Sequence, residues 1–154
     1  GPDLGIRHGP GHWPGLASHR LMDETLFPVA SPRMAGFDAI ETAADIARVP
    51  LTIHHARQGW HAWFRFADVH GAHLDERYSF SDTTDALLAA ANGLGAALAR
   101  ERVVVPYLAD GRLVALPGPR LPARWSYHIV WPAHRRLRPA AQGCVDWLLW
   151  VPMD

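Results

Sequence analysis

The stretch from Phe80 to Arg100 constrains the fold of this chain most, because it combines a polar start, an apolar helical face and a short apolar run. Ser81 or Asp82 can cap a helix here, since a short side-chain oxygen accepts a hydrogen bond from a free amide of the first turn. The apolar residues that follow recur at helical spacing and predict one buried face: Leu87, Ala90, Ala91 and Leu94.

The end of this stretch predicts a buried strand. Asn92 and Gly93 tolerate the left-handed backbone that ends many helices, and Gly95 then opens the run Ala96–Ala99. This run is too short for a helix and apolar enough for an interior strand. A polar helix start beside a buried strand is a common place for a small ligand in α/β proteins. Taken alone, the stretch also fits an ordinary capped helix without a ligand.

The composition restricts the classes of partner. Fifteen basic residues, all of them arginine, balance fifteen acidic residues, and 49% of the 154 residues are hydrophobic. A neutral chain is a poor candidate for a stand-alone nucleic-acid binder, which normally carries a basic face. No signal peptide or long apolar run is present, so we expect no membrane span.

The single cysteine, Cys144, excludes an internal disulfide and fits a reducing compartment. We therefore expect a cytoplasmic protein. Cys144 lies in the apolar context of the last predicted helix, where we expect a buried or partly buried side chain.

Short strands alternate with helices along the chain, which predicts an α/β fold with a largely parallel sheet. The predicted strands and extended segments cover residues 3–7, 20–29, 51–54, 76–80, 96–99, 112–116 and 125–131. Besides the helix that follows Phe80, helices are predicted at 43–48, 60–69, 103–108 and 139–150, the last with Val145, Leu148 and Leu149 inward.

The ten histidines raise the possibility of a metal site, and several of them lie between His54 and His73. A zinc site needs three or four converging ligands, but there is no H-E-x-x-H motif and no acidic partner at metal-site spacing. We expect surface or capping histidines and no metal or cofactor. The sequence also contains no G-x-S-x-G nucleophile elbow, phosphate loop or dinucleotide-binding fingerprint.

Seven tryptophans are many for this length. Trp60, Trp63, Trp147 and Trp150 have helical spacing and are predicted to lie in the core. Trp13, in a glycine-rich loop, and Trp125, at a strand start, could instead line a pocket or an interface.

Nine segments, taken in order, resemble the effector-binding domain of LysR-type transcriptional regulators. They are D-L-G-I-R-H-G (3–9), W-P-G-L (13–16), L-M-D-E-T-L-F-P-V-A-S-P (21–32), A-D-I-A-R-V-P-L (44–51), W-H-A-W (60–63), the stretch 80–100, L-A-D-G-R-L-V (108–114), S-Y-H-I-V-W-P (126–132) and D-W-L-L (146–149). Within the family, the sequence is most similar to the branch of the glycine-cleavage activator and the β-lactamase regulators.

The resemblance implies a fold like that of type II periplasmic binding proteins, with two α/β lobes joined by two crossing strands and a ligand between them. Leu26–Ala30 matches the first crossing, and Gly95–Ala99 lies near the return. The first lobe would then comprise residues 3–30 and 96–154, and the second lobe residues 31–95.

The chain departs from the family pattern at its start. The family's winged helix-turn-helix and linker helix are absent, as are the first strands of the first lobe, so we expect an incomplete first lobe with exposed edges or apolar surface. Gly1–Pro2 looks like the remnant of a cleaved tag, and residues 3–154 would form a partial effector-binding domain.

The resemblance also implies effector-binding residues. Ser81, Asp82, Thr83 and Thr84 match the polar helix start that faces the ligand, while Ser31 stands at the end of the crossing strand. Arg7 follows a first-lobe strand, and Tyr127 matches an aromatic position that borders the pocket. Arg7 and the helix start together would favour an effector that carries a carboxylate.

The function implied is a dimeric sensor that binds a small molecule and controls a DNA-binding domain, rather than an enzyme. DNA would be bound only through the family's helix-turn-helix, and no membrane is involved. Three alternatives stay open: a free-standing small-molecule binding module of the same fold, an enzyme that uses the His and Asp residues, and an inert dimerisation piece.

Overall fold

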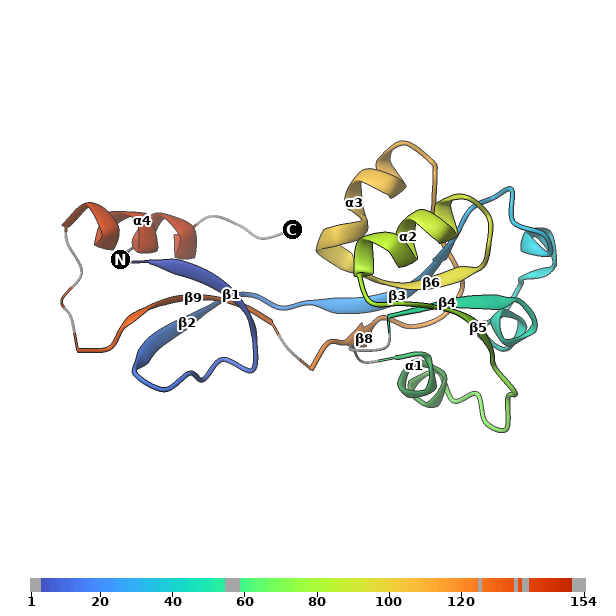
Figure 1. Cartoon of the computed structure of the whole chain (residues 1–154), viewed down its shortest axis with the longest axis horizontal. Helices are drawn as coiled ribbons and strands as arrows, with labels where there is room; N and C mark the ends of the chain where they lie inside the picture. The colour runs from blue at the N-terminus through green and yellow to red at the C-terminus, as the bar shows by residue number, and fades with distance from the viewer. Residues whose placement is uncertain (1–3, 55–58, 125, 135, 137–138, 151–154) are drawn as a thin grey trace. The chain divides into compact units, whose positions relative to one another are not determined.

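A computed structural model of the chain describes residues 4–54, 59–124, 126–134, 136 and 139–150. The chain forms two compact units (Figure 1). Unit 1 combines Gly1–Glu24 with Ala123–Asp154, and unit 2 is the continuous segment Thr25–Pro122.

Unit 1 contains a three-stranded antiparallel sheet with the order β1-β9-β2 and one helix (Figure 1). The strands are β1 (Gly5–Gly9), β2 (Leu16–Met22) and β9 (Ser126–Pro132), and the helix is α4 (Pro139–Trp150). Ile129, Val130 and Val145 are buried, so the central strand and the helix supply the apolar interior of this unit.

Unit 2 contains a mixed sheet with the order β5-β4-β6-β3-β7, in which β8 also pairs with β3. Its strands are β3 (Thr25–Ala30), β4 (Pro50–His54), β5 (Asp75–Phe80), β6 (Ala96–Arg100), β7 (Val114–Ala115) and β8 (Leu121–Pro122).

The prediction of a largely parallel sheet is wrong. Among the described residues, parallel pairing joins β4 to β5 and to β6, whereas β3 is antiparallel to β6, β7 and β8. Parallel neighbours need a crossover connection, and α1 (Trp60–Phe66) and α2 (Thr83–Ala91) supply the crossovers from β4 to β5 and from β5 to β6.

Two faces of the unit 2 sheet are covered. In Figure 1, α2 and α3 (Glu101–Ala109) lie on one side of the sheet and α1 lies on the other. Alternate residues of β3 and β6 pack with α2 and α3, as expected for a strand, in which every second side chain shares a face. This cluster comprises Phe27, Val29, Leu87, Ala90, Ala97, Ala99, Val104 and Leu113. Two short 3-10 helices, η1 (Phe37–Ala39) and η2 (Ala43–Arg48), precede β4.

The stretch from Phe80 to Arg100 forms the predicted helix and strand, with Leu87 and Ala90 buried on the helix face. The prediction of Leu94 on this buried face is wrong, because the helix ends before Leu94, which is 40% exposed. Asp82 caps α2, because its Oδ1 accepts a hydrogen bond of 2.8 Å from the backbone amide of Thr84. The helix ends at Ala91 with Asn92 as its C-cap, Gly93 adopts a φ of 83°, and β6 follows. Gly95 approaches β4 so closely that a Cβ would lie 2.5 Å from the carbonyl oxygen of Pro50, which explains why glycine stands before this strand.

Two of the predicted core tryptophans are confirmed. Trp60 and Trp63 are 3% and 0% exposed, and their rings meet edge to face with centroids 5.8 Å apart. Trp147 is 63% exposed, so its prediction as a core residue is wrong. It lies two residues after the buried Val145, which places it about 200° further around the helix. The side chain of Trp150 and residue Trp125 lie outside the described residues.

Cys144 also corrects a prediction, because it is exposed on α4 rather than buried. It precedes Val145 by one residue, about 100° around the helix. Val145 itself is 3% exposed and confirms the predicted inward position. The side chains of Leu148 and Leu149, predicted to lie inward, are outside the described residues.

The boundaries of the two compact units differ from the boundaries expected for the two lobes. The crossing strands β3 and β6 pair with each other, and β6 also pairs with β4, so residues 25–30 and 96–122 lie with unit 2. The physical reason is the backbone hydrogen-bond ladder, which holds both crossing strands in the centre of one sheet. The assignment of functional lobes stays a prediction.

Candidate functional site

Polar residues gather at one edge of the unit 2 sheet. The parallel strands β4, β5 and β6 end there at His54, Phe80 and Arg100, and the register places His54 opposite Phe80. Because β3 is antiparallel to β6, it begins at the same edge, with Leu26 opposite Arg100. Ligands of open α/β sheets bind outside the carboxyl ends of the strands, so this edge is the candidate site in unit 2.

The start of α2 lies at this edge, immediately after β5. Ser81, Asp82 and Thr84 are exposed, and Thr83 is half-buried. The structure therefore brings together the four predicted residues of the helix start. Their hydroxyl groups and the first-turn amides can donate hydrogen bonds to an anionic or polar ligand, and the helix dipole favours negative charge there. The Asp82 side chain already accepts a hydrogen bond from the Thr84 amide. The hydroxyl groups of Ser81, Thr83 and Thr84 are therefore the groups that can contact a ligand.

A second polar group lies at the same edge and was not predicted from the sequence. Thr25 Oγ1 donates a hydrogen bond of 2.9 Å to Glu101 Oε2, and Arg120 Nη1 lies 3.1 Å from Glu101 Oε1. The Arg120 guanidinium also lies 4.2 Å from the centroid of the Phe27 ring. Thr25 and Glu101 are 76 positions apart, and it is the pairing of β3 with β6 that brings them together, so no local pattern could indicate the contact.

Ser31 does not lie with the helix start, although both were predicted to contact the effector. It follows the end of β3, at the opposite edge of the sheet, because β3 is antiparallel to β6. The Oγ of Ser31 accepts a hydrogen bond of 3.1 Å from the backbone amide of Arg33. Ser31 as a whole is buried, with 3% of its surface exposed. The neighbouring Met34 packs at Gly93, the far end of α2, and the nine residues of that helix span about 13 Å. Ser31 thus stabilises a local turn.

Arg7 and Tyr127 lie on opposite faces of the unit 1 sheet. The register pairs Arg7 with His128 and His8 with Tyr127, and directly opposed residues share a face. The contacts agree, because Trp13 touches both Arg7 and His128, whereas the Tyr127 ring lies 4.9 Å from the His8 ring. The two predicted residues therefore cannot contact a ligand from the same side of this sheet.

The Tyr127 face also holds a buried carboxylate. The side chain of Glu24 is fully buried, and its Oε2 lies 3.8 Å from Nε2 of His8, which forms an ion pair when the imidazole is protonated. The sequence did not indicate Glu24 or His8 as site residues, because their contact depends on the pairing of both β1 and β2 with β9.

Exposed ion pairs and turns lower the pKa of three carboxyl groups. The Arg77 guanidinium lowers the pKa of Asp75, and Arg112 lowers the pKa of Asp110. Hydrogen bonds from the backbone amides of Glu41 and Thr42 lower the pKa of Asp45.

Within the described ranges, the structure contains no group of three or more His, Cys, Asp or Glu side chains arranged to hold a metal ion. Of the helices described, none is long and apolar enough to cross a membrane.

The comparisons with known proteins agree on one family. The LysR substrate binding domain family matches residues 1–150. The glycine cleavage system transcriptional activator of Escherichia coli strain K12 is 33% identical over 113 residues, which are 73% of this chain and 37% of the activator. The chain thus spans well under two thirds of the length of this relative.

Two solved structures have the same fold. The AmpR effector binding domain from Citrobacter freundii has a TM-score of 0.77 and 29% identity, covering 96% of this chain and 72% of that domain. The effector domain of AmpR from Pseudomonas aeruginosa has a TM-score of 0.78 and 25% identity, covering 96% of this chain and 70% of that domain.

These matches confirm the predicted fold class, an α/β fold like that of type II periplasmic binding proteins, and the predicted branch of regulators. The chain belongs to the LysR substrate binding domain family.

Proposed function

We propose that this chain is the small-molecule-sensing part of a LysR-type transcriptional regulator, in which effector binding shifts the population of states of a DNA-binding domain. The observation that carries the proposal is the family match over residues 1–150, together with the fold shared with two AmpR effector domains. The proteins with similar sequences are transcriptional regulators.

The start of α2 is the proposed effector contact in unit 2. Ser81, Asp82, Thr83 and Thr84 stand at the carboxyl edge of the parallel strands, which is the edge that binds ligands in open α/β sheets. The first-turn amides and hydroxyls favour an effector that carries a carboxylate. Ser31 is left out of the proposed site because it lies at the other edge of the sheet.

A ligand screen tests the proposal. Free amino acids, aromatic acids and cell-wall peptides are added to the chain, and the melting temperature is measured, since a ligand that binds the native state raises it. A hit is then titrated by calorimetry against the double variant Thr83→Val/Thr84→Val, which keeps the side-chain shape and removes two hydroxyls.

We expect the double variant to bind about tenfold more weakly, because each hydroxyl that donates to a charged ligand contributes to affinity. Asn92→Ala at the far end of the same helix is the matched control and should bind as the unaltered chain does. Equal affinity of the double variant and the control would remove the helix start from the site.

Arg7 and Tyr127 provide a second test of the effector site. Because they project from opposite faces of one sheet, we expect either Arg7→Ala or Tyr127→Phe, but not both, to weaken binding of the same effector. If Arg7→Ala leaves the affinity unchanged, the role of Arg7 is its contact with the Trp13 ring.

We also propose that the regulator is a cytoplasmic homodimer that binds DNA through a helix-turn-helix domain, as the resemblance implies. Sedimentation of the chain at several concentrations measures the oligomeric state. The gene that encodes the chain should also encode a helix-turn-helix in the same reading frame, and a reading frame without one would favour a free-standing binding module.

A further inference from the structure

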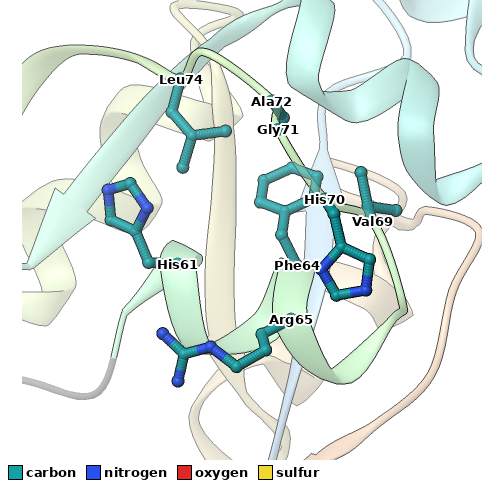
Figure 2. A pocket seen from close by; sticks show the side chains of 8 residues that line it. All are labelled: His61, Phe64, Arg65, Val69, His70, Gly71, Ala72 and Leu74. Atoms are coloured by element: carbon teal, nitrogen blue, oxygen red, sulfur yellow. The ribbon is translucent and has the colours of Figure 1, made fainter.

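An open hollow of about 180 Å³ lies in unit 2 beside α1 (Figure 2). Its two histidines already contact carboxylates, because Nε2 of His61 lies 2.6 Å from Oε1 of Glu76 and Nε2 of His70 lies 2.6 Å from Oδ1 of Asp68. Its aromatic residue, Phe64, is 3% exposed. The hollow thus presents mainly polar groups and indicates no ligand.

A more specific arrangement lies where the chain passes between the two units. The chain enters unit 2 between Glu24 and Thr25 and leaves it between Pro122 and Ala123. Strand β8 pairs with the start of β3, with Thr25 opposite Pro122. On the unit 1 side, the Ala123 amide donates a hydrogen bond of 2.8 Å to the carbonyl oxygen of Glu24. The two connections therefore run side by side as a short two-stranded segment, the connecting ribbon (residues 24–26 and 121–123).

One side chain, that of Glu101, contacts both connections. Glu101 lies in the first turn of α3, and its Oε2 accepts a hydrogen bond of 2.9 Å from Oγ1 of Thr25, the first residue of β3. Its Oε1 lies 3.1 Å from Nη1 of Arg120, which immediately precedes β8. Because Glu101 belongs to α3, the two contacts tie the connecting ribbon to the body of unit 2.

Arg120 is held from a second direction. Its guanidinium lies 4.2 Å from the centroid of the Phe27 ring. Phe27 is 3% exposed and belongs to the buried cluster beneath α2 and α3. The face of an aromatic ring attracts a cation, so the ring and the Glu101 carboxylate fix the guanidinium together. A displacement of the connecting ribbon would therefore break at least one of these contacts.

These contacts can open without unfolding of the sheet. The side chains of Glu101 and Arg120 are 37% and 52% exposed, and partly exposed ion pairs and hydrogen bonds contribute only modestly to stability. The central strands β3 and β6 are held instead by the backbone ladder that pairs residues 26–29 with 97–100. Local opening at the connecting ribbon therefore leaves the core of unit 2 in place.

We propose that Glu101 is a conformational clamp. By holding both connections against α3, it restricts the movement of unit 1 relative to unit 2, and its release frees that movement without unfolding either unit. Hinges are a few residues at the ends of elements that absorb changes in backbone angles, and here both connections meet one carboxylate. The clamp does not depend on the proposed sensing function, so its failure would leave that function standing.

Residual dipolar couplings of the backbone amides of the full 154-residue chain test the clamp, because they report the alignment of each unit separately. We expect Glu101→Ala to lower the degree of alignment of one unit relative to the other, as independent movement does. Amide exchange adds a local measure. The Ala123 amide should exchange about tenfold faster, whereas the Leu113 amide, which donates to the Tyr107 carbonyl within unit 2, should keep its rate.

Two further variants separate the clamp from the general loss of a carboxylate. Glu76→Ala is the matched control, since the Glu76 side chain is 41% exposed and also contacts a basic side chain, His61. It should change neither the relative alignment nor the exchange of Ala123. Thr25→Val removes one hydroxyl and keeps the pair of Glu101 with Arg120, so we expect a smaller increase in the exchange rate of Ala123.

The proposal is overturned if Glu101→Ala leaves the relative alignment of the two units unchanged, or if Glu76→Ala has the same effects. It is also overturned if Glu101→Ala accelerates the Leu113 amide as much as the Ala123 amide, because that result would indicate a general loss of stability in unit 2.

Discussion

The contact between Trp63 and Gly118 shows how one residue can determine local packing. Trp63 is fully buried, and its Nε1 donates a hydrogen bond of 3.0 Å to the carbonyl oxygen of Pro119. Gly118 has a φ of 128°, and a Cβ there would lie 2.4 Å from Cζ2 of the tryptophan. The loop thus needs glycine both for its backbone conformation and for the space beside the indole ring.

We expect Gly118→Ala to lower the free energy of unfolding by about 2 kcal/mol or more, because backbone strain and overpacking add. Gly111→Ala is the matched control: Gly111 also has a positive φ, 79°, but nothing lies within 4 Å of the added Cβ, so only the strain of about 1 kcal/mol applies. Urea unfolding measures the free energy of unfolding of both variants. An equal decrease in the two variants would show that the contact with Trp63 does not contribute.

At the scale of the element, the short helix η2 depends on one carboxylate. Asp45 Oδ2 accepts hydrogen bonds from the backbone amides of Glu41 and Thr42, both at 2.9 Å, and from the Thr42 hydroxyl at 3.2 Å. These bonds, the Glu41 amide first, hold the pKa of Asp45 below its ordinary value of 3.8. The ionised carboxylate therefore stabilises the start of η2.

This shift predicts a pH dependence with a definite sign. A carboxylate whose pKa is lower in the folded state contributes stability that is present above 3.8 and is lost as the pH falls through the lower folded-state pKa. We expect Asp45→Asn to melt at a lower temperature than the unaltered chain at about pH 5.5, and the difference to shrink at about pH 2.5.

Asp38→Asn is the control for this experiment, since Asp38 is exposed on the neighbouring helix η1. Its melting temperature should follow that of the unaltered chain at both pH values. A constant difference between Asp45→Asn and the unaltered chain across the pH range would contradict the role given to the ionised form.

At the scale of the whole molecule, unit 2 is a continuous segment with its own sheet and core. Thr25–Pro122 contains both crossing strands, the helices α1, α2 and α3, and the buried cluster that packs around Val29. Unit 1 is built from two separate segments, and among its described residues the large apolar side chains of Ile6 and Trp147 are each 63% exposed. The chain covers 70–72% of the two AmpR domains, so part of their fold has no counterpart here.

We expect a fragment of residues 25–122 to fold alone, with dispersed amide resonances and a cooperative urea transition, because its hydrogen-bond ladders and core are internal. A fragment of residues 31–95, the second lobe expected from the sequence, lacks β3 and β6 and should not fold. If the shorter fragment folds as well as the longer one, the two crossing strands are not needed for the stability of unit 2.

The sequence alone determined the features that depend on neighbours along the chain. The cap at Asp82, the left-handed end at Gly93 and the strand that follows were all predicted correctly, because capping and backbone preference act within a few residues. The ordered motifs also identified the family, and its match spans residues 1–150.

The tertiary structure decided which of these features meet. The antiparallel direction of β3 separates Ser31 from the start of α2, and the register of β1 on β9 places Arg7 and Tyr127 on opposite faces. The direction and register of strand pairing depend on contacts between residues far apart in the chain. The polar start of α2 is formed by residues that are neighbours along the chain, so the sequence predicted it correctly. The contact of Thr25 with Glu101 at the same edge joins residues far apart in the chain and required the folded sheet.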